Sequence, residues 1–398
     1  MTPYLIEWLN LILRFVHVIT GVAWIGASFY FVWLDNHLQT PPKWKQDKGI
    51  KGDLWSIHGG GFYEVAKYQN GPEKIPEILH WFKWEAYSTW LSGFLLLCVM
   101  YYLGAESYLI DRSVADLSQA QAIGIGLLSI FGGWLIYELL CRSKLGKYAI
   151  VLALLLLVLT SALAYGLSQL ISARGMYIHI GALIGTIMAG NVFTVIMPSQ
   201  RALVAAVTEG TTPDPAWGAK AKLRSTHNTY IVLPLLFIMI SSHYPMTYNH
   251  QHGWLVLVCL FIITAAARWY FVLRHTNRQN ILIPIGVVIA TLLLIYAMSD
   301  KNQAEPVDMS SAALVGKAEV ETIITTHCVG CHSSKPTDAI FTVAPAGVML
   351  NDYASMLRWM PAIKARVVDS HNMPLMNKTN MTQQERDTLG LWIAQSNQ

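Results

Sequence analysis

Long apolar runs separated by short polar stretches dominate the first three quarters of the chain. A helix that spans a membrane needs about 20 mostly apolar residues. Runs of about that length occur at residues 5–33, 79–104, 122–141, 148–170, 176–197, 229–245, 253–273 and 280–298. This pattern predicts an all-α fold in which residues 1–300 form a polytopic bundle of about eight transmembrane helices.

Lysine and arginine gather in every second loop of this predicted bundle. The loops after the first, third, fifth and seventh runs carry fifteen of them, whereas the opposite loops carry only Arg112 and Arg174. Short basic loops remain on the cytoplasmic side of a membrane. We therefore predict a bacterial inner-membrane protein with both termini on the periplasmic side.

A polar segment, Ser299 to Ser311, follows the last run and predicts a linker to a second domain at residues 301–398. That domain contains Cys328-Val329-Gly330-Cys331-His332, the C-x-x-C-H spacing used for covalent attachment of a c-type haem. Cys328 and Cys331 would form the thioethers, and His332 would be the proximal iron ligand. A zinc site is disfavoured because no second cysteine pair accompanies the motif.

A second axial ligand is expected in the segment "HNMPLMN", which offers His371, Met373 and Met376. Methionine opposite histidine is common in electron-transfer cytochromes and raises the potential. We favour Met373, which a proline follows. Helices are predicted around residues 313–330 and 353–359 and from a capping box at Thr382. The domain resembles a class I cytochrome c.

Overall composition supports a membrane protein, with 54% hydrophobic and 13% charged residues. Soluble domains carry about 25% charged residues. The formal charge of +4 is modest and gives no indication of a nucleic-acid partner.

Ionisable side chains inside the apolar runs are costly and therefore mark candidate functional positions. Arg14 and His17 lie three residues apart, on one helix face, near the middle of the first run. His179 and His243 are predicted in the outer half of the membrane. Neutral imidazole suits iron, so His17 with His179 or His243 could ligate a non-covalent haem b.

Five segments, taken in order, carry a family resemblance: "RFVHVITGVAWIGASFYF", "WFKWEAYSTWLSGF", "GALIGTIMAGNVFTVIMPSQR", "STHNTYIVLPLLFIMISSHYP" and "THCVGCH". With them the whole chain resembles the PuuD-type membrane urate oxidase (urate hydroxylase) family. The resemblance implies oxidation of urate to 5-hydroxyisourate. It also implies that electrons leave through the cytochrome, to an acceptor such as a soluble cytochrome c or a terminal oxidase, without making peroxide.

Such chemistry requires a base near the purine ring and donors for its carbonyl groups. The candidate catalytic residues are Arg14, His80, Glu85, Asn191, His227 and Asn228. Two positions for the pocket remain open. One lies at the cytoplasmic ends of the second, fifth and sixth runs and needs a haem b relay. The other opens outward, where Arg14, His17 and His243 would serve the substrate directly.

Two other function classes remain compatible with the sequence. A membrane cytochrome that oxidises quinol would use the same haem motif without a purine site. A transporter with a fused redox module would also place polar residues at mid-membrane.

Overall fold

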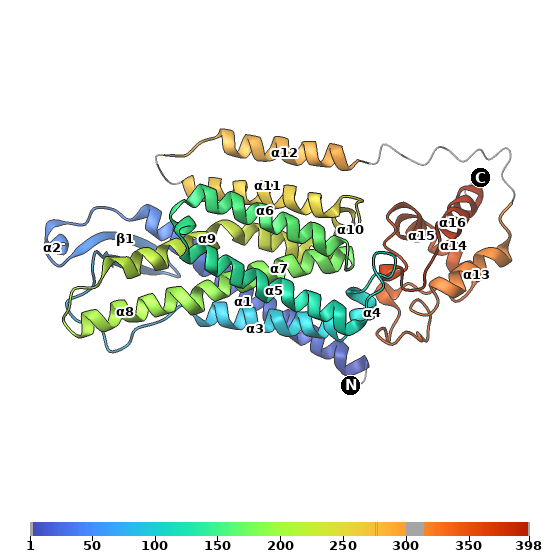
Figure 1. Ribbon diagram of the computed structural model, residues 1–398, viewed down its shortest axis with the longest axis horizontal. Coiled ribbons are helices and arrows are strands. Elements are labelled where there is room, and N and C mark those ends of the chain that lie inside the picture. The colour runs from blue at the N-terminus through green and yellow to red at the C-terminus, as the bar shows by residue number, and fades with distance from the viewer. Residues whose placement is uncertain (1–2, 275, 277, 300–313, 397–398) are drawn as a thin grey trace.

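The computed structural model describes residues 3–274, 276, 278–299 and 314–396, and it is mostly helical, at 69% (Figure 1). The helical content agrees with the predicted all-α class. Apart from Ser299, the predicted linker at residues 299–311 lies outside the described residues.

Each of the eight apolar runs coincides with a helix or with a run of joined helices. These are α1 (Pro3–His37), α3 (Trp84–Leu97) with the π-turn η1 (Cys98–Tyr102), α5 (Gln119–Arg142), α6 (Ala149–Ser168), α7 (Ala173–Asn191) continued by η3 (Val192–Ile196) and α8 (Met197–Thr208), α9 (Pro215–Ser241), α11 (Gly253–Leu273) and α12 (Leu282–Met298). Within the described part of the chain, five of them are long and apolar enough to cross a membrane, namely α1, α5, α6, the α7–α8 unit and α11. The structure is thus compatible with a membrane protein.

Two helices begin at positions that the apolar runs do not mark. α3 starts at Trp84, so the preceding residues, including His80, lie in an irregular segment. α9 starts at Pro215, where the side chain of Asp214 accepts a hydrogen bond from the amide of Ala216 (2.8 Å). An aspartate cap followed by proline is a strong helix start, which explains why the basic residues 220–224 are helical.

The long loop after α1 contains structure that the sequence reading did not predict. α2 (Lys43–Gln46) precedes an antiparallel hairpin of β1 (Ile50–His58) and β2 (Gly61–Tyr68). Gly59 and Gly60 form its turn with φ of +56° and +82°, values that glycine adopts without steric cost. Lys45 is buried and pairs with Asp53 and Glu64, which joins α2 to the hairpin.

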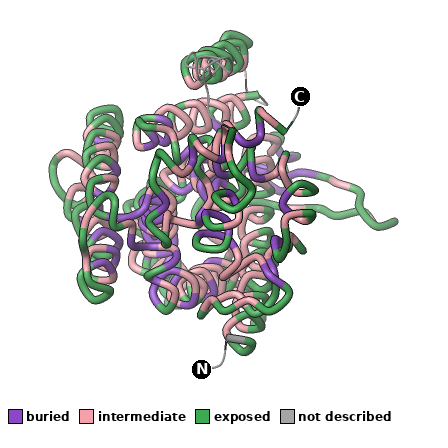
Figure 2. Tube along the Cα trace, turned by 90° about the vertical axis from the view of Figure 1, so that its right-hand side faces the viewer, coloured by how far each residue is buried: buried purple, intermediate pink, exposed green. Residues whose placement is uncertain are grey.

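α7 occupies the middle of the bundle, where it contacts α3, α5, α6, α9 and α11. Most of its residues are buried, including Tyr177, His179 and Ile180. Its glycines allow neighbouring helices to approach closely. α12, by contrast, contacts α11 at the edge of the bundle and has no buried residue; Figure 2 shows it as the exposed and half-buried helix at the top.

The C-terminal domain is a small helical unit. It consists of α13 (Lys317–His327), η4 (Pro345–Gly347), α14 (Tyr353–Arg358), α15 (Met360–Ile363), η5 (Lys364–Asp369), η6 (Leu375–Asn377) and α16 (Gln383–Ser396). The remaining short helices, α4 (Ala105–Tyr108), η2 (Lys144–Lys147) and α10 (Pro245–Tyr248), belong to the bundle.

The predicted capping box before α16 is confirmed. The Thr382 amide donates to the Glu385 carboxylate (2.7 Å), and the Glu385 amide donates to the Thr382 hydroxyl (3.2 Å). Hydrogen bonds to this carboxylate from the Thr382 amide and hydroxyl, together with one from His327, lower the pKa of Glu385 to about 2. Leu389, Trp392 and Ile393, which recur at helical spacing along α16, are all buried.

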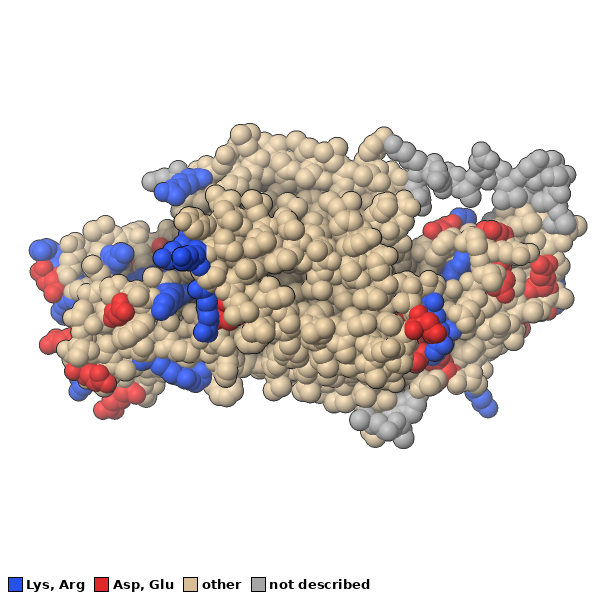
Figure 3. Space-filling model, in the orientation of Figure 1, with Lys and Arg blue, Asp and Glu red and all other residues tan. Residues whose placement is uncertain are grey.

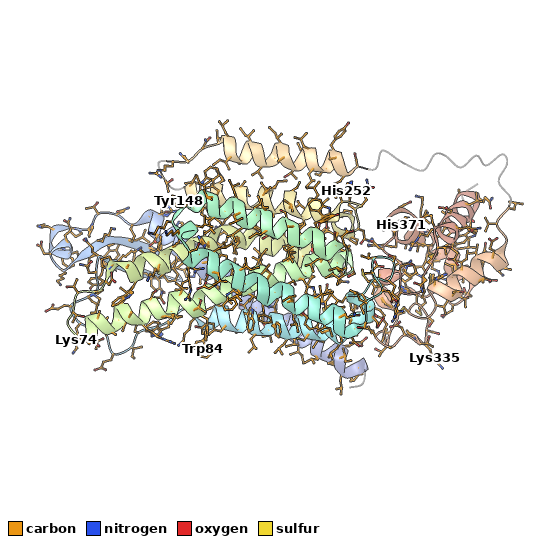
Figure 4. The ribbon with its side chains drawn as sticks, viewed as in Figure 1. Lys74, Trp84, Tyr148, His252, Lys335 and His371 are labelled. Carbon is orange, nitrogen blue, oxygen red and sulfur yellow. The ribbon has the colours of Figure 1, made fainter. Side chains whose placement is uncertain are left out.

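Charged side chains collect at the two ends of the molecule. On the face shown in Figure 3, a broad band free of Lys, Arg, Asp and Glu separates a basic end from the C-terminal domain. Figure 4 shows Lys74 at the basic end and Lys335 in the C-terminal domain, at opposite ends of the long axis. The hairpin and the C-terminal domain therefore lie on opposite sides of the apolar band.

We predict that only the C-terminal side faces the periplasm. Lys74→Cys and Gln384→Cys place thiols at exposed positions on the two sides, in a background in which Cys98, Cys141 and Cys259 are serine. A membrane-impermeant maleimide added to spheroplasts should label Gln384→Cys and spare Lys74→Cys, because basic loops stay inside. Inside-out vesicles, the matched control, should give the reverse. Labelling of Lys74→Cys from outside would overturn this orientation.

Candidate functional site

A cavity of about 480 Å³ lies among α1, α3, α7 and α9. Its walls are mostly aliphatic and aromatic. Polar groups reach it at a few points: Arg14, His17, Ser28, Thr89, Tyr101, Arg174, Thr186, Asn228, Ser242 and His243. An apolar cavity with a few convergent polar groups is the usual form of a small-molecule site. Gly185 leaves part of this space open, since an added Cβ would meet no atom within 4 Å.

The cavity runs lengthwise within the bundle. Arg14, Arg174 and His243 come from the beginning of α1, the beginning of α7 and the residues just after α9. Figure 1 shows that these helix ends face the C-terminal domain. Asn228, farther from that end of α9, lines the opposite end of the cavity. The charged end of the cavity therefore lies beside the C-terminal domain.

Two arginines enter the cavity without a carboxylate partner. Arg14 donates to the Asn10 side chain (3.2 Å) and to the Met100 sulfur (2.9 Å). Arg174 donates through Nε to the Tyr101 hydroxyl (3.1 Å). Within the described part of the chain, neither guanidinium forms an ion pair. Both side chains are half-buried. Because a guanidinium stays charged and these two have no carboxylate partner among the described residues, this end of the cavity is suited to an anion.

His17 presents one ring nitrogen to the cavity. Its Nδ1 lies 3.0 Å from the carbonyl oxygen of Thr89 and 3.3 Å from the Ser92 hydroxyl. A carbonyl can only accept, so Nδ1 carries the proton and Nε2 of the neutral ring keeps its lone pair. Gly93 permits this position, since a Cβ there would lie 2.6 Å from the His17 ring. Nε2 is thus available as a base or as a metal ligand.

The other two histidines predicted to bind haem b differ from each other. His243 lines the cavity with His17. His179 does not line it: its side chain is fully buried, with Nδ1 2.8 Å from the Gly175 carbonyl and Nε2 3.3 Å from the Tyr102 hydroxyl. Both of its ring nitrogens are engaged, so the geometry favours a packing role for His179 and leaves His17 and His243 as the cavity pair.

Asn191 and Asn228, predicted from separate runs, meet at the inner end of the cavity. Asn191 Nδ2 donates to the Asn228 side-chain oxygen (2.9 Å) and to the Tyr137 hydroxyl (2.9 Å). Asn228 in turn donates to the Met188 carbonyl (3.0 Å) and lines the cavity. These bonds connect α5, α7 and α9.

Charged groups extend this network toward the basic end. Arg224 donates to Asn191 (3.1 Å) and forms an ion pair with Glu138 (2.9 Å), with both charged side chains buried. The Tyr137 hydroxyl lies 2.8 Å from Nδ1 of His227. The predicted residue His227 therefore joins the network but does not line the cavity. Glu138 and Arg224 were missed, although an acidic residue within the third apolar run was a visible signal.

The remaining predicted residues lie outside the cavity. His80 is exposed in the irregular segment before α3. Glu85 lies in the first turn of α3, and among the described residues its buried Oε2 has no hydrogen-bond partner. Lys83 lies 5.7 Å from the ring of Trp84, which is itself exposed. The geometry thus favours the outward pocket over one built from His80 and Glu85, and it adds Arg174, which the sequence presented only as a loop charge.

A family model described as urate oxidase N-terminal matches residues 3–299. The chain belongs to the urate oxidase N-terminal family. The matched region contains the whole bundle and every residue that lines the cavity. A search of curated proteins and a search of solved structures return no match. Membership supports oxidation chemistry related to urate for this urate oxidase family member.

The C-terminal domain of the urate oxidase family member lies beyond the matched residues, and its haem motif has a geometry that fits haem c. His332 Nδ1 lies 3.1 Å from the Val348 carbonyl, which leaves Nε2 for the iron. Cys328 belongs to the domain core, and Met373 packs against that core. Arg386 donates to the Met373 carbonyl (2.7 Å) and fixes the backbone of the expected ligand segment. His371 is exposed.

We expect Cys328→Ala or Cys331→Ala to abolish covalent haem on a denaturing gel, because each substitution removes a thioether. Met373→Ala should keep covalent haem but change its spectrum and lower its potential, since a soft axial ligand is lost. Met376→Ala is the matched control and should change neither. The assignment of Met373 fails if Met376→Ala alone produces these changes.

Proposed function

We propose that this urate oxidase family member is a membrane-bound enzyme that oxidises urate to 5-hydroxyisourate and passes the electrons through a haem c in its C-terminal domain. The unpaired Arg14 and Arg174 at one end of an apolar cavity carry the proposal. The family match over residues 3–299 and the C-x-x-C-H motif support it.

Urate is a planar purine that is an anion at neutral pH, and the cavity suits both properties. Arg14 and Arg174 would bind the anion with charge-assisted hydrogen bonds. The aromatic side chains of Trp90 and Phe94, which are stacked at 5.4 Å and line the cavity, provide flat apolar surface for the ring. Binding at this end would orient the purine between His17 and the C-terminal domain.

The reaction is a two-electron oxidation with addition of water: the urate anion and water give neutral 5-hydroxyisourate, one proton and two electrons. Nε2 of neutral His17 is placed to take this proton, because Nδ1 is held by the Thr89 carbonyl. His243 is the other imidazole in the cavity and is the second candidate acceptor. The haem c would supply a one-electron acceptor, so the two electrons leave in succession.

The direction of electron flow follows from the orientation that the basic loops predict. With the C-terminal domain in the periplasm, electrons would leave to a soluble cytochrome c or a terminal oxidase, and oxygen would not be reduced to peroxide at the site. The charged end of the cavity lies on the same side as the domain. Direct transfer from this pocket needs no relay across the hydrocarbon core.

The cavity residues are also compatible with a non-covalent haem b. His17 offers a free Nε2, His243 lines the same space, and Arg14 and Arg174 could pair with carboxylate groups of a porphyrin. Such a haem would relay electrons between a deeper substrate position and the C-terminal domain. Extraction of non-covalent haem distinguishes this arrangement from direct electron transfer between the substrate and haem c.

We expect urate to reduce the haem under anaerobic conditions, with two haems reduced per urate consumed, because each haem accepts one electron. The measurement is the haem absorbance of purified protein on addition of urate. Reduction by a quinol but not by urate would favour the quinol-oxidising alternative. Uptake of urate into vesicles without haem reduction would favour the transporter.

Extraction of the same protein with acidified acetone tests for the relay, because a covalent haem c stays with the protein and a haem b does not. Protein that releases no haem yet is still reduced by urate would exclude the relay. Extractable haem that is lost in His17→Ala, with haem c intact, would establish it.

Arg14→Gln and Arg174→Gln should each weaken urate binding by about tenfold or more, because a hydrogen bond to a charged group contributes about 1.5–3 kcal/mol. Binding is measured by equilibrium dialysis. Arg112→Gln is the matched control, since Arg112 is exposed and pairs with Glu106 outside the cavity. Unchanged affinity in both cavity variants would contradict the proposed binding mode.

A further inference from the structure

The C-terminal domain contacts the bundle next to the charged end of the cavity. Lys378 Nζ donates to the Ser107 hydroxyl of α4 (3.1 Å), and Asn249 donates to Asn372 (2.6 Å). Figure 4 shows His252, close to Asn249 in sequence, at the bundle end that faces the domain carrying His371. Asn372 directly precedes Met373, the expected axial ligand. The segment that would hold the haem therefore meets the bundle directly.

Aromatic rings link this contact to the wall of the cavity. Tyr101 lines the cavity, and its ring centroid lies 6.0 Å from that of Tyr108. The Arg174 guanidinium joins them: its Nε donates to the Tyr101 hydroxyl, and its central carbon lies 5.1 Å from the centre of the Tyr108 ring. Tyr108 does not line the cavity and is the chain neighbour of Ser107. The three side chains thus span the distance between the cavity and the domain contact.

On the domain side, a second set of contacts leads to the haem motif. Lys378 forms an ion pair with Asp338 (2.7 Å), and the Asp338 amide donates to the carbonyl of Gly330, the residue before Cys331 (3.1 Å). Burial raises the pKa of Asp338, but the hydrogen bond and charge of Lys378 outweigh it and hold that pKa below its usual range. Cys331 is one of the two expected thioether positions. Together with the peptide link between Tyr108 and Ser107, these contacts connect the cavity to the C-x-x-C-H motif.

We propose that Tyr101, Arg174 and Tyr108, continued by Lys378 and Asp338, form the route by which electrons leave the cavity for the haem motif. This inference rests on the proposed function, and it extends it to Tyr108, Lys378 and Asp338, which do not line the cavity. Electron tunnelling decays exponentially with distance and decays faster across empty space than through atoms in contact. Closely spaced rings, a guanidinium over a ring and short hydrogen bonds therefore favour this route.

The electron balance is that of the proposed reaction. One urate anion loses two electrons, which would pass singly to the haem c that Cys328, Cys331 and His332 would hold, a one-electron acceptor. An external one-electron acceptor would take up each electron in turn. The one proton released stays at the substrate pocket and moves to a histidine there or to water. The tyrosines are a bridge and undergo no net change.

Tyr108 offers a clean test because it lies outside the pocket. Among the described residues no hydrogen bond to its hydroxyl is present, so Tyr108→Phe keeps the ring and its packing. Tyr108→Leu keeps an apolar side chain and removes the ring. In anaerobic stopped-flow mixing with urate, the phenylalanine variant should reduce its haem within about twofold of wild type, and the leucine variant about tenfold or more slowly.

Three further measurements show whether a slower reduction comes from the loss of the ring or from weaker binding or misfolding. Urate affinity by equilibrium dialysis, covalent haem content and the haem midpoint potential should be unchanged in both variants, which shows that binding and folding are intact. If Tyr108→Leu does not fold, Lys378→Met replaces it. That substitution removes the contacts with Ser107 and Asp338 and should also slow reduction about tenfold.

The outcomes separate this inference from the function on which it rests. Wild-type protein that urate cannot reduce would overturn both. Wild-type protein that urate reduces, with an equally fast Tyr108→Leu variant that binds urate normally, would overturn the route alone. Slower reduction in both Tyr108→Phe and Tyr108→Leu would also overturn it, because a bridging ring does not need the hydroxyl.

Discussion

An unpaired positive charge inside an apolar helix bundle is the constraint on which the interpretation of this molecule depends. Glu138 forms an ion pair with one buried arginine of the bundle, Arg224. Arg268 is held by the Thr229 carbonyl and the ring of Phe29, away from the cavity. Arg14 and Arg174 have weak neutral partners and share a cavity. Because both guanidinium groups are half-buried, charged and without a carboxylate partner among the described residues, this part of the cavity is suited to an anion.

Helix packing explains why the cavity is closed at one end and charged at the other. Toward the basic end, Asn191, Asn228, Tyr137 and Arg224 tie α5, α7 and α9 together, and every bond removes a polar group from contact with lipid. Gly185 leaves part of the cavity open, since an added Cβ would meet no atom within 4 Å, and Gly93 makes room for the His17 ring, which lies 2.6 Å from where its Cβ would be. The polar network thus connects the helices, and the two glycines leave space for the cavity and for His17.

The position of the cavity also bears on the distance that electrons would travel from the substrate to a haem in the C-terminal domain. A pocket at the cytoplasmic ends of the helices would separate substrate from haem by a hydrocarbon core about 30 Å thick. The arginines instead come from the helix ends that face the C-terminal domain, and Lys378 contacts Ser107 across the boundary. In the proposed enzyme, substrate and acceptor would occupy the same side of the membrane, which makes a deep relay unnecessary.

The sequence by itself determined the helices, the C-x-x-C-H motif and the capping box at Thr382, because apolar periodicity, a covalent motif and local hydrogen bonding depend on neighbouring residues. It also indicated Arg14, His17, Asn191 and Asn228, since polar residues in an apolar run are conspicuous. Only the tertiary structure decided which of them share a space. It placed His17 and His243 in the cavity, gave His179 two internal partners and left His80 exposed. The sequence presented Arg174 only as a loop charge and did not single out Tyr108. What distinguishes these two residues is the packing of α4, α7 and the C-terminal domain, which brings together residues that are far apart in the chain.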